Sequence, residues 1–154
     1  MNSLNAAIEK FTSLKLCTVG ERGDLHERPN KVLVLLVAMD LLDEDQATPT
    51  QIPWNADFRA RFSHYFAQVK RTEDIDSAES QFLNLRNDGI WQAYEINHGE
   101  VEPCEAQPTA QDDGLVFASF TDDLKELILD REVRMELRQA LLKRYFPEKA
   151  EGLI

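Results

Sequence analysis

The chain has few of the residues that support redox, metal or secreted chemistry. Its 154 residues include only two cysteines, Cys17 and Cys104, and only three histidines. Two cysteines are too few for a disulfide framework or a zinc site, and a reducing cytoplasm is the simplest location for such a chain. We therefore expect a cytoplasmic protein that carries no metal and no other cofactor.

Long hydrophobic runs and the common catalytic motifs are also missing. The longest apolar run, from Val32 to Met39, is far shorter than the ~18 residues that a membrane span requires. The N-terminus lacks a basic start followed by an apolar block, so we expect no signal peptide. No GxxxxGK, GxGxxG, GxSxG or HExxH motif occurs. We expect no membrane partner and no catalytic activity, although an unrecognised pair of carboxylates remains an open alternative.

Positive charge is scarce as well, with 17 Lys and Arg against 28 Asp and Glu and a net charge of −11. Taken alone, this total argues against nucleic-acid binding, which requires clustered cations. The acids are concentrated in residues 40–113, which carry a net charge of −11, whereas residues 1–39 carry +1 and residues 114–154 carry −1. A neutral or basic surface built from the two ends of the chain is therefore compatible with the sequence.

The length suggests one domain spanning residues 1–154, and the pattern predicts a mainly helical α+β fold. Apolar residues at helical spacing predict an amphipathic helix over 3–15, followed by a polar loop over 20–30. Residues 31–42 are apolar nearly all round, which indicates a buried central helix, with a strand as the less favoured alternative. We expect the remaining elements to pack around this helix, together with a small β-hairpin.

Several local signals mark the other elements. Asn55 is placed to cap a helix that runs to about Val69, and Thr121 and Asp130 are placed to cap two later helices. Alternating apolar residues predict a strand over 90–96. Residues 100–113 contain two prolines and are expected to be irregular.

The segment FLNLRNDGIW raises a question about Arg86, which lies beside a predicted tight turn. Gly89 is free to take the positive φ that such a turn requires. The simplest role for Arg86 is an ion pair with Asp88 that stabilises the turn. The alternative is a binding role, since the guanidinium group suits phosphate oxygens and base edges. For the cations of residues 131–144, the simplest role is likewise structural: they form the solvated face of a helix.

The order of the local motifs resembles the sulfur-recognising domain of phosphorothioate-dependent type IV restriction endonucleases. The matching pieces are Arg28-Pro29-Asn30-Lys31 ahead of a Leu-rich helix, FLNLRNDGIW, and the terminal LLKRYFP. The resemblance covers roughly residues 20–147. It implies a non-catalytic module that recognises phosphorothioated double-stranded DNA in a restriction or antiviral defence system, with cleavage supplied by a nuclease domain or subunit.

The resemblance also implies which residues make up the site. Those implied to contact DNA are Arg28, Asn30, Lys31, Arg86 and Asn87, and those implied to form the modification pocket are Ser80, Gln81, Phe82 and Asn84. An apolar pocket rimmed by cations and N–H groups prefers sulfur, because oxygen loses more hydration on entering.

Three positions in two of the segments differ from the family pattern. Asn30 replaces a His, and Ser80-Gln81 replaces a Tyr-Pro pair, so the pocket is expected to be more polar than in the family. With the acidic middle of the chain, these differences leave a second hypothesis open. In it, the same scaffold serves as an acidic protein-interaction module or DNA mimic that docks a nuclease or another defence subunit.

Overall fold

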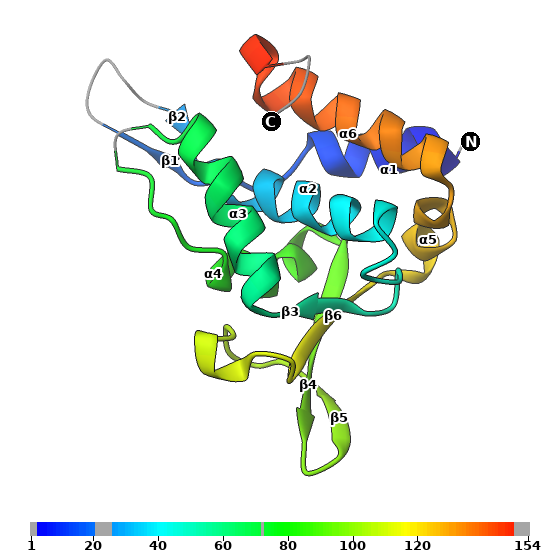
Figure 1. The fold of residues 1–154 in the computed structure, drawn as a ribbon. Coiled ribbons are helices and arrows are strands. Elements are labelled where there is room, and N and C mark those ends of the chain that lie inside the picture. The colour runs from blue at the N-terminus through cyan, green and yellow to red at the C-terminus, as the bar shows by residue number, and fades with distance from the viewer. Residues whose placement is uncertain (1–2, 21–25, 72, 150–154) are drawn as a thin grey trace.

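The computed structural model describes residues 3–20, 26–71 and 73–149, and these ranges form an α+β fold (Figure 1). The α-helices are α1 (Ser3–Thr12), α2 (Asn30–Asp43), α3 (Ala56–Val69), α4 (Glu79–Asn84), α5 (Asp122–Lys125) and α6 (Arg131–Tyr145). The strands are β1 (Thr18–Val19), β2 (His26–Glu27), β3 (Ile52–Trp54), β4 (Trp91–Asn97), β5 (Glu100–Pro103) and β6 (Val116–Phe120). Short 3₁₀ helices are η1 (Leu85–Asp88), η2 (Ala110–Asp112), η3 (Leu127–Leu129) and η4 (Pro147–Lys149).

Helix α2 is the centre of the fold, as the sequence predicts. Its residues from Val32 to Met39 are at most 1% exposed, because α3, α4 and α6 contact it from different sides. Helix α1 packs against α6 on the outside of this arrangement (Figure 1). A helix that is apolar all round can be stable only inside such a shell.

A cluster of aromatic rings links α3 and α4 to the sheet. Trp54, Phe58 and Phe82 contact one another with ring centroids 5.1–5.8 Å apart, and Trp91 lies 5.2 Å from Phe82. The side chain of Asn55 accepts a hydrogen bond from the Phe58 amide at 2.8 Å, which confirms the predicted helix cap.

The antiparallel sheet has the strand order β3-β6-β4-β5, so the expected small hairpin is only one part of the β-structure. Residues 100–113 were expected to be irregular, which is wrong for Glu100–Pro103, because these residues pair with β4. All four β5 residues are exposed, so no apolar alternation marks this strand in the sequence. The β4–β5 hairpin projects away from the helices (Figure 1).

Three further predictions need correction. The first helix was expected to reach residue 15 but ends at Thr12. The segment 20–30 was expected to be a loop but contains β2, which pairs with β1. Residues 21–25 of this segment lie outside the described residues. Thr121 lies at the N-cap position of α5, but its side chain makes no capping hydrogen bond. Asp130 does cap α6, by accepting a hydrogen bond from the Glu132 amide at 2.8 Å.

Candidate nucleic-acid interface

A small hollow of about 200 Å³ lies at the N-terminal end of α2. Four segments meet there: the residues after α1, the first turn of α2, helix α4 and the helix η1. The residues that line it are Lys15, Leu16, Cys17, Arg28, Asn30, Lys31, Ser80, Gln81, Asn84 and Asn87. Seven of the nine residues that the sequence suggested for the site therefore share one surface feature. The two that do not line it are Phe82 and Arg86.

Lys31 is held inside the protein by Asp88. The Lys31 ammonium donates to Asp88 Oδ2 at 2.7 Å and to the Lys15 carbonyl at 2.7 Å, while Asp88 Oδ1 accepts from the Lys15 amide at 2.7 Å. The side chains of Lys31 and Asp88 are only 8% and 2% exposed. A buried pair of this kind fixes geometry, because each charge left alone would be costly. It ties α2, η1 and the residues after α1 together around the hollow.

Asn30 fastens the segment before α4 to the start of α2. Its Nδ2 group donates to the carbonyls of Ile75 at 2.9 Å and Ser77 at 2.8 Å, and the residue is 3% exposed. Its Oδ1 atom is buried and has no hydrogen-bond partner among the described residues. Asn30 thus contributes to the wall of the hollow mainly through its fixed position.

Arg28 differs from Lys31 in that no described carboxylate pairs with it. The residue is half-buried, and its guanidinium makes no ion pair or hydrogen bond with any described residue. The side-chain amides of Gln81 and Asn87 likewise have no hydrogen-bond partner within residues 3–20, 26–71 and 73–149. In addition, no side chain caps the first turn of α2. The hollow therefore offers hydrogen-bond donors and positive potential to an anion.

Arg86 lies next to the hollow in sequence but is oriented toward the start of the segment after β5. It is exposed, and its Nη1 donates to the Cys104 carbonyl at 3.3 Å. The simpler interpretation, an ion pair between Arg86 and Asp88, is wrong, because Asp88 is engaged by Lys31. The predicted bend is confirmed, since Gly89 follows η1 with a φ of 69°.

Phe82 does not line the hollow but anchors α4, the helix that does. It is fully buried in the aromatic cluster, and its carbonyl accepts a hydrogen bond from the Trp91 indole at 2.8 Å. These contacts fix α4, which presents Ser80, Gln81 and Asn84 to the hollow. Asn84 in turn donates to the Ser80 hydroxyl at 3.3 Å.

Three lining residues were not predicted from the sequence: Lys15, Leu16 and Cys17. They lie before the matching motifs and carry no motif of their own. The Lys15 ammonium donates to the Asn87 carbonyl at 3.0 Å. Only the folded arrangement shows that this segment faces α4.

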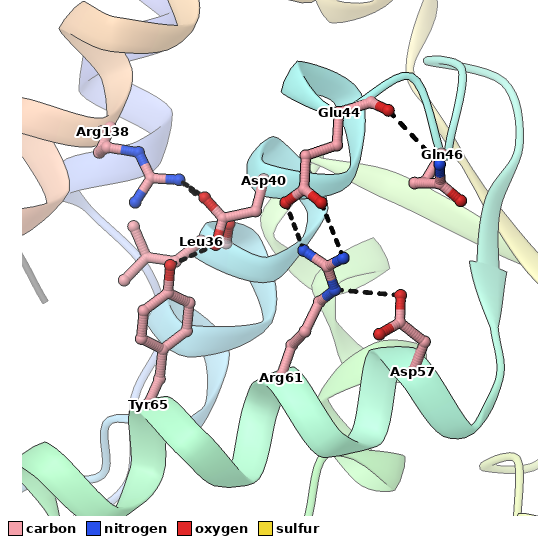
Figure 2. Close-up of polar contacts among 8 residues, drawn as sticks. All are labelled: Leu36, Asp40, Glu44, Gln46, Asp57, Arg61, Tyr65 and Arg138. Atoms are coloured by element: carbon pink, nitrogen blue, oxygen red, sulfur yellow. Dashed lines mark hydrogen bonds and ion pairs between the residues drawn. The ribbon is translucent and has the colours of Figure 1, made fainter. Parts of the chain in front are cut away.

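At the other end of α2, the arginines are engaged by carboxylates (Figure 2). Arg138 pairs with Asp40, to which the Tyr65 hydroxyl also donates, and Arg61 binds Glu44 through two hydrogen bonds of 2.6 and 3.0 Å. Burial, and then the hydrogen bond to Asp40, raises the pKa of Tyr65.

Arg134 lies in the same region and corrects the expectation of a solvated face on α6. It is 9% exposed, and its Nε donates to Asp43 at 2.7 Å. Its Nη1 donates to the carbonyls of Ile128 and Leu129 at 2.8 and 3.0 Å. Arg138 is also only partly exposed, so both side chains connect α6 to α2.

The described residues show neither a metal site nor a membrane-spanning helix. Within residues 3–20, 26–71 and 73–149, no group of three or more His, Cys, Asp or Glu is arranged to hold a metal ion. None of the helices in these ranges is long and apolar enough to cross a membrane.

Comparison with protein families gives one match that covers nearly the whole chain. Residues 5–154 match the family described as "ScoMcrA-like, DNA sulfur-binding domain". No curated protein matches the chain.

Proposed function

The chain belongs to the family of ScoMcrA-like DNA sulfur-binding domains, and on this basis we propose that the hollow at the N-terminal end of α2 receives the sulfur-bearing linkage. A domain of this family binds phosphorothioated DNA. The observation that carries the proposal is that Arg28, the first turn of α2 and the residues of α4 line one hollow.

The donors of the hollow suit a phosphorothioate. The linkage keeps its negative charge, which the Arg28 guanidinium and the first turn of α2 attract. The amide groups of Gln81 and Asn87 can donate to its oxygens. In this arrangement Lys31 and Asn30 set the shape of the site, while Arg86 and Asn87 contact the neighbouring backbone or base edges.

The wall of the hollow combines polar and apolar surface. Leu16 and Cys17 lie on one side, and Ser80, Gln81 and Asn84 lie on another. A sulfur atom is larger and less strongly hydrated than oxygen, so apolar wall favours it and polar wall reduces the preference. We infer that this chain prefers phosphorothioate by a smaller margin than a domain whose pocket is apolar throughout.

The finer features of the function follow from the same proposal. We infer that the ligand is double-stranded DNA, that the chain acts as one recognition domain in the cytoplasm, and that it serves a restriction or antiviral defence system. Any cleavage would come from a nuclease domain or subunit. The test is incubation of the purified chain and a phosphorothioated duplex with Mg²⁺ or Mn²⁺, for which intact DNA is the expected result. Metal-dependent cleavage would contradict this assignment.

Binding titrations test the site directly. Fluorescence anisotropy would be measured on a labelled duplex with one phosphorothioate and on its unmodified twin, at several salt concentrations. The phosphorothioate duplex should bind more tightly, and both affinities should fall as salt rises. Gln81→Leu should increase the preference for sulfur by about 1 kcal/mol, because oxygen loses hydration in a less polar wall.

Arg86→Ala gives a second test of the site. It should weaken binding to both duplexes by roughly 1–3 kcal/mol if the guanidinium contacts a base edge. The matched control for Gln81→Leu is Gln139→Leu, which makes the same chemical change at an exposed residue of α6 that does not line the hollow, and the sulfur preference should stay unchanged. Equal affinity of the native chain for the two duplexes would contradict the assignment of the hollow.

A second candidate function, protein interaction, has one observation in its favour. The projecting β4–β5 hairpin exposes Ile96 and Val101, 40% and 57% exposed, beside the acids Glu95, Glu100 and Glu102. An exposed apolar pair with an acidic rim suits a protein partner with a basic surface, such as a nuclease subunit. If no duplex binds at low salt, this function is favoured over DNA recognition.

A further inference from the structure

A cleft of about 620 Å³ lies beside the hollow, and most of its lining residues have no role in the proposal above. It lies between the β1–β2 pair, the C-terminal end of α3 and the C-terminal end of α6. In Figure 1 these elements lie at the end of the molecule opposite the β4–β5 hairpin. A cavity of this size is in the range that accommodates a nucleotide-sized group.

The charge of the cleft is opposite to that of the chain. Its lining includes five cations, Arg28, Lys70, Arg71, Arg144 and Lys149, against three acids, Glu27, Asp74 and Glu148. The chain as a whole has a net charge of −11, yet five of its 17 Lys and Arg residues line this one cleft. Local potential of this kind, rather than net charge, determines where a polyanion binds.

One of the three acidic groups of the cleft, Asp74, is already engaged inside the protein. Asp74 has a fully buried side chain that contacts the His26 ring at 2.9 Å and accepts from the Arg71 amide at 2.8 Å. Glu27 makes only a loose contact of 3.6 Å with Arg144. The Arg144 side chain is 47% exposed and stacks over Tyr145, with its guanidinium carbon 4.6 Å from the ring centroid. This stacking holds the cation at the surface, where it stays accessible to an anion.

The cleft adjoins the hollow at the N-terminal end of α2. Leu16 and Arg28 line both cavities. A DNA strand seated with one linkage in the hollow would therefore extend along the cleft in one of its two directions. Duplex DNA carries one negative charge about every 1.7 Å along its axis, so its flanking phosphates would meet these cations.

We propose that the cleft is a second DNA subsite, which binds backbone phosphates on one side of the modified linkage without reading sulfur. The proposal rests on the assignment of the hollow as the site of the modified linkage. Lys70, Arg144 and Lys149 supply positive charge from three separate segments, and Arg28 joins the two subsites. Contacts of this type fix position and register and carry no information about the modification.

The test is the double variant Lys70→Gln/Arg144→Gln, measured by anisotropy on phosphorothioated and plain duplexes. Both affinities should fall by roughly tenfold, and the slope of log K against log salt should become shallower by about 2, because two phosphate contacts are lost. The ratio of the two affinities should stay within about twofold of the native ratio, since the subsite does not contact sulfur.

The matched control is Lys125→Gln/Arg131→Gln, which removes the same charge from the end of α5 and the N-terminal end of α6. Arg131 and Arg144 are separated by about 20 Å along this helix. The control should leave both affinities within about twofold of the native values, apart from the small effect of net charge. Thermal unfolding of both variants should match the native chain, because Lys70, Arg144 and Arg131 are exposed.

Duplex length provides an independent measurement. Trimming the duplex on one side of the modified linkage should lower its affinity for the native chain. The same trimming should not further lower its affinity for Lys70→Gln/Arg144→Gln. Native-like binding by that double variant would overturn the proposal, and so would a selective loss of sulfur preference. Failure of the hollow assignment would appear instead as equal affinity of the native chain for the two duplexes, and the plain-duplex data would still test the cleft.

Discussion

The two ends of α2 use their cations in different ways. At the C-terminal end, Arg134 and Arg138 pair with Asp43 and Asp40, which α2 itself supplies. At the N-terminal end, only Lys31 is neutralised, by Asp88, whereas Arg28 has no partner among the described residues. The cations near the C-terminal end thus stabilise the packing of α6 against α2, whereas the charge of Arg28 at the N-terminal end is available to a ligand.

This contrast explains how an acidic protein can bind DNA. A cation paired with a carboxylate contributes to folding but attracts little from outside, because the two charges cancel at a distance. When the neighbours of a cation are amides and helix N–H groups, its electrostatic potential is not cancelled and attracts an anionic ligand. The four predictions below test whether folding and binding separate along α2 in this way, beginning with the largest expected effect.

Asp88→Asn should cause the largest loss of stability. It leaves the buried Lys31 ammonium without a counter-charge, which costs about 3–5 kcal/mol in the free energy of unfolding. Urea denaturation measures this change. Asp122→Asn is the control, since Asp122 is 96% exposed in its pair with Lys125 and should change stability by less than about 0.5 kcal/mol. Equal effects of the two substitutions would show that burial of the Lys31 pair has no energetic importance.

Arg134→Met should cost about 2–4 kcal/mol, because Asp43 and the carbonyls of Ile128 and Leu129 lose their donor. DNA affinity, measured below the unfolding temperature, should not change. Arg131→Met is the matched control on the same helix, and its effect on stability should be small. A loss of DNA affinity with Arg134→Met would break the proposed separation of folding and binding.

The third prediction concerns alkaline pH. Burial raises the pKa of Tyr65, so the folded chain keeps this proton at a pH where the unfolded chain, with a tyrosine pKa of about 10, has lost it. The contribution of Tyr65 to the free energy of unfolding is therefore fully present below pH ~10. Above that pH it falls by at most about 1.4 kcal/mol per pH unit. Tyr65→Phe should make the fall less steep in urea titrations between pH 9 and 11. An unchanged slope would exclude this role for Tyr65.

Arg28→Gln should have the smallest effect on stability and a clear effect on binding. The free energy of unfolding should change by less than about 0.5 kcal/mol, because the guanidinium has no partner within the described ranges. DNA affinity should fall by about 1 kcal/mol and the salt slope by about 1. Arg61→Gln is the control, an arginine held by Glu44 and Asp57, and should leave DNA affinity unchanged. Equal losses of affinity from the two substitutions would contradict the distinction between paired and unpaired cations.

Much of the fold could be predicted where the signal is local. The apolar stretch of α2, the Asn55 cap and the positive φ of Gly89 each follow from the chemistry of a few neighbouring residues. Strand β5 could not be predicted, because both of its faces are exposed and only its pairing with β4 makes it a strand.

The residues of the candidate site were likewise predictable only in part. The motifs around Arg28 and Ser80 marked two segments as candidates, and the hollow includes both. They gave no sign of Lys15, Leu16 or Cys17, which reach the hollow only through the path of the chain after α1.

By itself, the sequence determined the central helix, the main turns and caps, and the family to which the motifs point, because these depend on residue types at short spacing. Tertiary structure alone decided which cations are neutralised. Lys31 and Asp88 are 57 positions apart, and Arg134 and Asp43 are 91 apart. Charges interact through space, so a sequence that lists acids and bases does not reveal which positive charges remain for DNA until the chain has folded.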